Sequence, residues 1–304
     1  MGRRSPAACR GPGPGYSRGG RGGDHGPGAG GDGSGGAGEN RHLGTLPLPQ
    51  VRSGHGRRPY GQGQDGRGHD RLYQAARASV HRRGLVIPEV RILGVCGSPV
   101  RGGNVEALLE RVLYSQDGQP GVSFKMATLA DGGVGDCIHC NWCLRKQEGS
   151  RRCSVDDGMT ALYPLVEEAD VLLFATPVYF GRLSGHIAAF IDRLRVYVHG
   201  NVSAGMLRNK VGGSMAVAWF RMAGLEMALI TMNQFFYAVN MVIASSEMGL
   251  QGGSAFSSLQ GMGGRDGDDR LLVLRDELGT ASAVSTLSRA VELARIIKAG
   301  TAAL

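Results

Sequence analysis

The chain has 304 residues, a formal net charge of +8 at pH 7 and 51 glycines. No apolar run reaches the roughly 18–20 residues that a transmembrane helix needs, and no stretch near Met1 has the apolar core of a secretory signal. The sequence therefore argues against a membrane protein or a membrane partner, and we expect a cytoplasmic protein.

The first 88 residues differ in composition from the rest. They consist largely of Gly, Arg, Pro, Ser, His and Gln, with 14 Arg against 5 Asp or Glu. So little apolar surface cannot offset the entropy that ordering a chain costs, and we expect a disordered extension over residues 1–88 and a folded domain over residues 89–304. The extension is either a basic arm that binds RNA or anionic surfaces, or an unselected addition from an upstream start. Because the positive charge lies in the extension, we expect no nucleic-acid partner for the folded domain.

The folded domain opens with a strand, a loop and a helix. An apolar run over residues 90–96 stops at Gly97, and an amphipathic pattern resumes over about 103–117. The first loop, residues 97–104, combines glycines that let N–H groups turn inward with polar side chains and a helix N-terminus, namely Gly97, Ser98, Arg101, Gly102, Gly103 and Asn104. This composition suits a phosphate, although it matches neither a Walker A loop nor the dinucleotide fingerprint. An ordinary turn between strand and helix is the alternative.

Strands and helices alternate along the rest of the domain. The predicted strands are 122–127, 171–176, 211–218 and 241–244, and the predicted helices are about 157–168, 184–196, 222–237 and 280–298. Five alternating strands predict a doubly wound parallel sheet with helices on both faces, and the flavodoxin-like order 2-1-3-4-5 is the natural choice. Right-handed crossovers then place the loops after the first and third strands side by side.

The second distinctive stretch, residues 176–193, begins with a loop that has the composition of a site for a flat ring. We name the part before the predicted helix, residues 177–184, the second loop. Pro177 ends the third strand, Tyr179 and Phe180 bring aromatic groups to the edge of the sheet, and Gly181 allows close approach of the backbone. Further on, Asp192 and Arg193 lie within one helical turn, where they either contact a substrate or form an ion pair at the end of the helix.

Four of the six cysteines lie in one stretch, residues 131–157, which we name the cysteine loop. They are Cys137, Cys140, Cys143 and Cys153. Three cysteines separated by two residues each, with a fourth further on, favour an iron–sulfur cluster, because zinc sites more often pair two separate Cys-x-x-Cys knuckles. Zinc, or thiols that bind nothing, are the alternatives. We expect His139 to be a surface residue and Cys96 to be a buried small hydrophobe.

Three motifs together resemble the flavodoxin-like NAD(P)H-dependent FMN reductases, and most closely their iron–sulfur flavoprotein branch. The motifs are Gly97-Ser98-Pro99 with Gly103-Asn104, the Asp156-Asp157-Gly158-Met159 run after the cysteines, and the stretch from Pro177 to Arg193. The resemblance extends over residues 90–304.

The resemblance implies two cofactors and the residues that hold them. It places Ser98, Arg101, Gly103, Asn104 and Val105 at the FMN phosphate. It places Pro177, Val178, Tyr179, Phe180 and Gly181 against the isoalloxazine ring, and it gives the four cysteines a four-iron, four-sulfur (4Fe-4S) cluster.

Three positions depart from the family pattern. Val105 stands where the family usually has Thr or Ser, and Ala188 stands where it often has Lys. The third loop, residues 218–224, lacks the usual glycine pair after a basic residue.

The expected function is that of an FMN-dependent NAD(P)H oxidoreductase. Electrons would pass from NADH or NADPH through the flavin, and through the cluster where one is present, to a flavin, quinone, nitroaromatic or protein acceptor. The alternative is a flavodoxin-type carrier without nicotinamide oxidation, because the chain has no dinucleotide fingerprint. We also expect a homo-oligomer, since the family commonly closes its flavin site with a neighbouring chain.

Overall fold

The computed structural model describes residues 87–131, 133–265 and 267–303. The predicted disordered extension lies almost entirely outside the described residues. Among those residues, no helix is long and apolar enough to cross a membrane.

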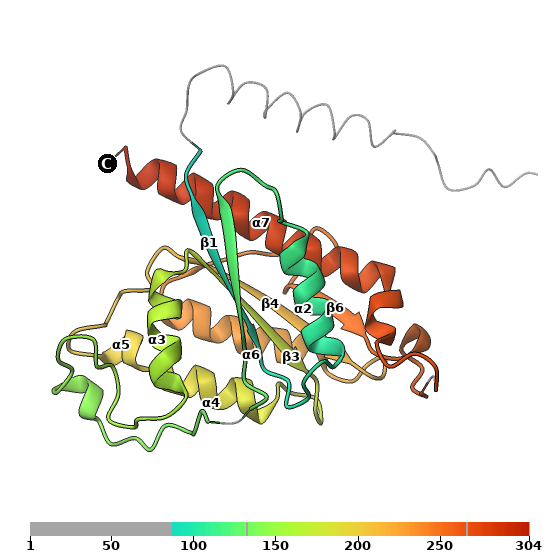
Figure 1. Ribbon diagram of the computed structural model, residues 1–304, viewed down its shortest axis with the longest axis horizontal. Coiled ribbons are helices and arrows are strands. Elements are labelled where there is room, and N and C mark those ends of the chain that lie inside the picture. The colour runs from blue at the N-terminus through green and yellow to red at the C-terminus, as the bar shows by residue number, and fades with distance from the viewer. Residues whose placement is uncertain (1–86, 132, 266, 304) are drawn as a thin grey trace, which may run out of the picture. The chain divides into compact units, whose positions relative to one another are not determined.

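A parallel sheet forms the centre of the domain (Figure 1). Its strand order is β2-β1-β3-β4-β5, which confirms the order predicted from the sequence. All the strand pairs are parallel. The strands are β1 (Val90–Cys96), β2 (Val122–Thr128), β3 (Val171–Pro177), β4 (Val211–Ala218) and β5 (Val242–Ile243).

A sixth strand, β6 (Gly253–Phe256), was not predicted. It pairs with β4 over Met215 to Ala218, whereas β5 pairs with the beginning of the same strand at Val211 and Gly212. Two short strands therefore share one edge of β4. The run Gly-Ser-Ala-Phe has neither a β-branched residue nor a clear alternation, so no local signal marks it as a strand.

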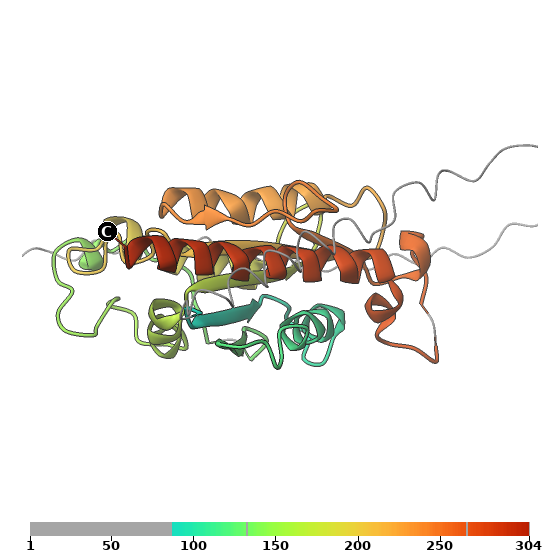
Figure 2. The same cartoon turned by 90° about the horizontal axis from the view of Figure 1, so that it is seen from above.

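Helices cover both faces of the sheet, because strand residues alternate between two separate cores. In β1, Leu93 and Val95 belong to one core, and Ile92 and Cys96 belong to the other. The first core is closed by α3 (Met159–Glu168), α4 (Gly185–Arg193), α5 (Val196–His199) and α6 (Leu225–Ala238). The second is closed by α2 (Asn104–Tyr114) and α7 (Glu277–Thr301). Figure 2 shows α7 along its length, with α6 and α2 on opposite sides of it in that view.

Short 3-10 turns complete the domain. They are η1 (Trp142–Leu144), η2 (Leu259–Gly261) and η3 (Leu272–Arg275). The first lies inside the cysteine loop, which runs between β2 and α3. The loops that follow β1, β3 and β4 leave the sheet at the carboxyl ends of parallel strands, which is where doubly wound folds bind ligands.

Candidate functional site

The first loop presents an open helix N-terminus. Gly103 is the N-cap of α2, and no side chain of the described residues caps the helix, so the N–H groups of its first turn face the loop without a side-chain acceptor from them. The buried hydroxyl of Ser98 accepts a hydrogen bond from the Val100 N–H at 3.1 Å and holds the turn. This arrangement suits an anion, because helix N-termini carry partial positive charge.

The polar side chains of the first loop are already engaged. Arg101 is exposed and its Nε donates to Asp131 at 2.7 Å, at the start of the cysteine loop. The Asn104 amide donates to the Arg270 carbonyl and accepts from the Val273 N–H. Asn104 therefore ties η3 to the loop.

Two further residues determine which N–H groups of the first loop are available to a ligand. Val105, only 4% exposed, packs in the core, so its side chain does not face the loop and only its N–H group is available there. The Glu106 carboxylate accepts from the Gly102 N–H at 2.9 Å, a contact that sequence reasoning missed. The only sign of this contact in the sequence was that Glu106 is an acidic residue in the first turn of a predicted helix.

The second loop is a tight turn with an exposed aromatic tip. Tyr179 and Arg182 exchange two backbone hydrogen bonds, and the residues between them, Phe180 and Gly181, have φ angles of 50° and 77°. Positive φ at both central positions defines a type I′ turn, which suits Gly but is uncommon for an aromatic residue. Phe180 is fully exposed and Tyr179 is 42% exposed. Strain of this kind concentrates at ligand sites.

Ser184 joins the first and second loops. Its hydroxyl donates to the Gly97 carbonyl at 2.5 Å and accepts from the Ile187 N–H at 3.3 Å as the N-cap of α4. Gly97 itself lies against α4, since a Cβ there would be 2.6 Å from the Cβ of Ile187. Sequence reasoning predicted that the loops adjoin but missed Ser184, whose signal was its position as a polar residue before an amphipathic helix.

The third loop packs on the second. Gly224 has a φ of +94°, and a Cβ there would come within 2.6 Å of the Gly181 Cα. The loop contributes the exposed aromatic pair Trp219 and Phe220, whose rings are 4.9 Å apart, and the fully exposed Met222. Aromatic and apolar side chains therefore border the edge where the loops after β3 and β4 meet.

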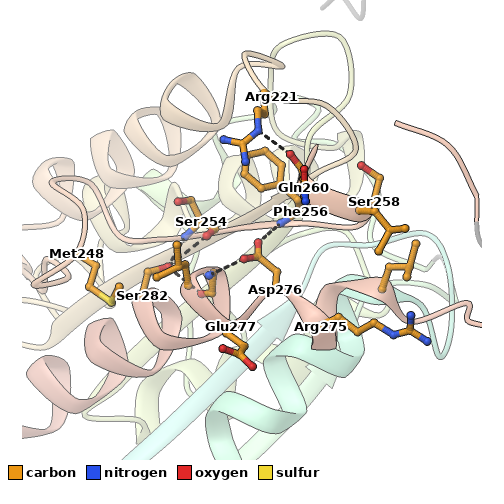
Figure 3. A pocket seen from close by; sticks show the side chains of 14 residues that line it. Arg221, Met248, Ser254, Phe256, Ser258, Gln260, Arg275, Asp276, Glu277 and Ser282 are labelled. Atoms are coloured by element: carbon orange, nitrogen blue, oxygen red, sulfur yellow. Dashed lines mark hydrogen bonds between the residues drawn. The ribbon is translucent and has the colours of Figure 1, made fainter. Parts of the chain in front are cut away.

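The basic residue of the third loop is directed to a different cavity. Arg221 lines a pocket of about 500 Å³ between β6 and the start of α7 (Figure 3). Its Nε donates to the Gln260 carbonyl at 2.5 Å and its guanidinium lies 5.4 Å from the centre of the Phe256 ring. Asp276, which caps α7, accepts from the Phe256 N–H on the other side of the pocket. The Arg221 contacts therefore hold the third loop to β6 and to η2, and the Asp276 contact holds α7 to β6.

The four predicted cluster ligands gather around one small pocket. Cys137, Cys140, Cys143 and Cys153 line it together with residues of α4 and its continuation. Cys143 is buried, Cys137 and Cys153 are half-buried, and Cys140 and the neighbouring His139 are exposed. Across the described residues, no three His, Cys, Asp or Glu side chains form a group that could hold a single metal ion.

Two arginines border this pocket, Arg193 at the end of α4 and Arg195 at the N-cap of α5. Arg193 is 1% exposed, and it pairs with Asp157 at 2.6 Å rather than with its neighbour Asp192. Arg193 therefore forms the ion pair predicted at the end of the helix, but its partner is Asp157 instead of Asp192. This pair anchors the cysteine loop to α4. Arg195 donates from Nη1 to the Cys143 sulfur at 3.7 Å and from Nη2 to the Asn141 amide oxygen at 2.8 Å.

Three of the thiols differ in pKa. A hydrogen bond from Ser154 lowers the pKa of Cys140, whereas burial raises the pKa of Cys143. Burial also raises the pKa of Cys96 to about 11, and this side chain is fully buried, as predicted. The thiolate, which binds metals, is therefore most accessible at Cys140.

Comparison with known proteins gives concordant matches. A family model described as NADPH-dependent FMN reductase matches residues 90–254. An iron-sulfur flavoprotein of Methanocaldococcus jannaschii is 30% identical over 209 residues, which cover 69% of this chain and all of that protein. An iron-sulfur flavoprotein of Archaeoglobus fulgidus is 32% identical over 204 residues, covering 66% and 96% of the two chains.

A solved structure shares the fold. The crystal structure of RosB with a bound 8-demethyl-8-formylriboflavin-5'-phosphate intermediate superposes with a TM-score of 0.50. The match covers 69% of this chain and 81% of that one, at 14% identity.

Proposed function

Because the chain belongs to the NADPH-dependent FMN reductase family, we propose that it holds FMN at its first and second loops and moves electrons from NADH or NADPH to an acceptor. Family membership, which the motifs predicted, makes the protein a flavin-dependent oxidoreductase. The choice of nicotinamide and the acceptor, which we take to be a flavin, a quinone or a protein, belong to the proposal.

The observation that carries the proposal is the Ser184 to Gly97 hydrogen bond of 2.5 Å. It supports the proposal because it joins the first loop, which leads to the open N-terminus of α2, to the second loop, which has the aromatic tip. The proposed anion and ring sites would then share one edge of the sheet. In this arrangement the N–H groups at the start of α2 bind the phosphate. Tyr179 and Phe180 lie against the ring and exclude water. FMN supplies the capacity to accept a hydride and to release electrons singly or in pairs.

We further propose that the four cysteines hold a 4Fe-4S cluster. The four thiols line one pocket, and so does Arg193, whose buried Nε–H has no hydrogen-bond partner among the described residues. The curated relatives are named iron-sulfur flavoproteins. Such a cluster supplies one-electron transfer, which would couple a two-electron nicotinamide donor to one-electron acceptors.

Flavin binding and reduction test the first proposal. Protein mixed with FMN should bind it and show a flavin spectrum, and rapid mixing with NADPH or NADH should bleach that spectrum. Protein that takes up no FMN would contradict the proposal. Flavin that binds but is bleached by neither nicotinamide would leave the flavodoxin-type carrier as the function.

Metal analysis tests the second proposal. Protein purified without oxygen should contain iron and acid-labile sulfide, and Cys140→Ala should lose both while keeping FMN. Cys96→Ala is the matched control, because Cys96 is a buried cysteine on β1. This variant should contain as much iron as the parent protein. Flavin-loaded protein that contains zinc, or no metal, would contradict the cluster.

We also propose a cytoplasmic homo-oligomer. Phe180 and Met222 are fully exposed beside the proposed ring site, and Phe220 is half exposed. A second copy of the chain would cover this apolar rim and shield the flavin from water. Light scattering at micromolar concentration should report at least a dimer, and a monomer would contradict this expectation.

A further inference from the structure

Arg193, whose side chain lines the cysteine pocket, has one buried hydrogen-bond donor without a partner in the part of the chain that the structure describes. The Arg193 guanidinium carries five N–H groups. Nη1 donates to the Gly135 carbonyl at 3.1 Å and to Asp157 at 2.6 Å, and Nη2 donates to the Val155 carbonyl at 3.2 Å and to Asp157 at 3.1 Å. The fifth group, at Nε, is buried and has no acceptor within residues 87–131, 133–265 and 267–303.

The unpartnered N–H belongs to a side chain that lines the pocket of the four cysteines. The charge of Arg193 interacts with Cys153, and Arg195 reaches the Cys143 sulfur from the following turn. A buried donor without an acceptor is costly, and nearly all such groups in folded proteins find a partner. Because Arg193 lines the cysteine pocket, a sulfur in that pocket is the candidate acceptor for Nε.

We infer that Arg193 donates its Nε–H to a sulfur of the group that the four cysteines bind, and that it thereby raises the reduction potential of that group. The inference rests on the proposed cluster. Reduction adds negative charge, and a cationic hydrogen-bond donor beside the sulfurs stabilises the reduced form more than the oxidised form. Arg193 thus acts as a positioning and tuning residue that does not touch the flavin.

A purely structural role for Arg193 makes a different prediction. Its four Nη bonds already hold Asp157, Gly135 and Val155 to α4, so an anchor alone would account for them. An anchor affects how well the cysteine loop folds, but it leaves the potential of a correctly assembled cluster unchanged. The two roles are separated by comparing a variant that changes Nε with one that changes only the anchor.

Arg193→Lys and Asp157→Asn form that pair. Lysine keeps the positive charge but has no N–H group at the Nε position, whereas Asp157→Asn weakens the anchor and leaves Nε in place. Each variant and the wild type are purified without oxygen and loaded with FMN. Iron and sulfide are then measured, and the potentials of cluster and flavin are titrated in the same sample.

For Arg193→Lys we expect the equilibrium constant for one-electron reduction of the cluster to fall about tenfold, which is about 59 mV. The flavin potential should stay unchanged. For Asp157→Asn we expect iron to be retained and the cluster potential to stay the same or rise, because a negative charge is removed.

Three results would overturn the inference. They are an unchanged cluster potential in iron-loaded Arg193→Lys, equal lowering of the potential in both variants, and loss of iron in both variants. Each of these leaves the cluster proposal intact, because the wild type still contains iron. Wild-type protein without iron would instead overturn the cluster proposal and this inference together.

Discussion

A single carboxylate, Asp157, ties the end of the cysteine loop to its beginning and to α4. It accepts from Arg193 and from the N–H groups of Gly135 and Met159, the latter two at 3.0 Å. Burial pushes the pKa of Asp157 upward, but the bonds from Arg193 and from the two N–H groups outweigh burial and leave the pKa below its ordinary value. The charged form is therefore the one that the fold prefers.

This preference makes the stability of the domain depend on pH at Asp157. The unfolded state binds a proton at this carboxyl more readily than the folded state does, so the contribution is complete above about pH 3.8 and is lost as the pH falls through the lowered folded-state pKa. We expect Asp157→Asn to be about 3 kcal/mol less stable at pH 7, because the charge of buried Arg193 loses its partner. The difference should shrink at pH 3. Urea unfolding at both pH values measures it, and an equal difference at both would contradict the prediction.

The cysteines should differ widely in reactivity. Cys140 is exposed with a lowered pKa, whereas Cys96 is fully buried and its pKa is about 11. In metal-free protein at pH 7.5, iodoacetamide should modify Cys140 on the order of 100-fold faster than Cys96, since the thiolate is the reactive form. Peptide mass spectrometry over time gives the two rates.

A control variant tests the cause of that difference. Ser154→Ala removes the hydrogen bond that lowers the pKa of Cys140, so it should slow the reaction at Cys140 without changing the rate at Cys96. Similar rates at the two cysteines in the parent protein would contradict the burial that the structure assigns to Cys96.

At the level of secondary-structure elements, the site depends on how closely α4 packs on the loop after β1. We expect Gly97→Ala to cost about 1–3 kcal/mol of stability, because its Cβ would lie 2.6 Å from that of Ile187 and nothing there can yield without moving the helix. FMN affinity should fall about tenfold as the first loop shifts away from α4. Thermal unfolding and flavin fluorescence titration measure the two effects.

Gly185→Ala is the matched control for that substitution. Gly185 lies on α4, the helix against which Gly97 packs. A Cβ added at Gly185 would meet no described atom within 4 Å. Alanine is also the better helix former, so stability should stay equal or rise slightly and FMN affinity should not change. Equal losses of stability in Gly97→Ala and Gly185→Ala would contradict close packing at Gly97 as the cause of the effect.

The same elements show which features a sequence can reveal. The strands, the first loop and the second loop were predictable because glycine, proline and apolar periodicity act over a few residues. The link between Arg193 and Asp157 spans 36 residues and the link between Ser184 and Gly97 spans 87, so no local pattern encodes either. The strand β6 escaped prediction for the same reason, because its pairing with β4 supplies what its own sequence lacks.

At the level of the whole molecule, every residue of the candidate site and of both cores lies within the described domain. We therefore expect protein that lacks residues 1–86 to bind FMN, to hold iron and to unfold at the same temperature as the full chain. Affinity for an RNA homopolymer separates the two interpretations of the extension. A basic arm predicts salt-sensitive binding that deletion abolishes, and an unselected addition predicts no binding above that of the domain. Loss of flavin binding on deletion would contradict the predicted independence of the domain.

The contact between Arg193 and the cysteine loop also orders events during synthesis. The four cysteines and Asp157 leave the ribosome before β3 and α4, so the loop emerges without the side chain that anchors it. Chains are made from the N-terminus at about 5–20 residues per second, and the 36 residues from Asp157 to Arg193 delay the anchor by a few seconds. During that interval the thiols are open to oxidation and to stray metals. Assembly of the proposed cluster is therefore best suited to a chain that has been completed at least through α4.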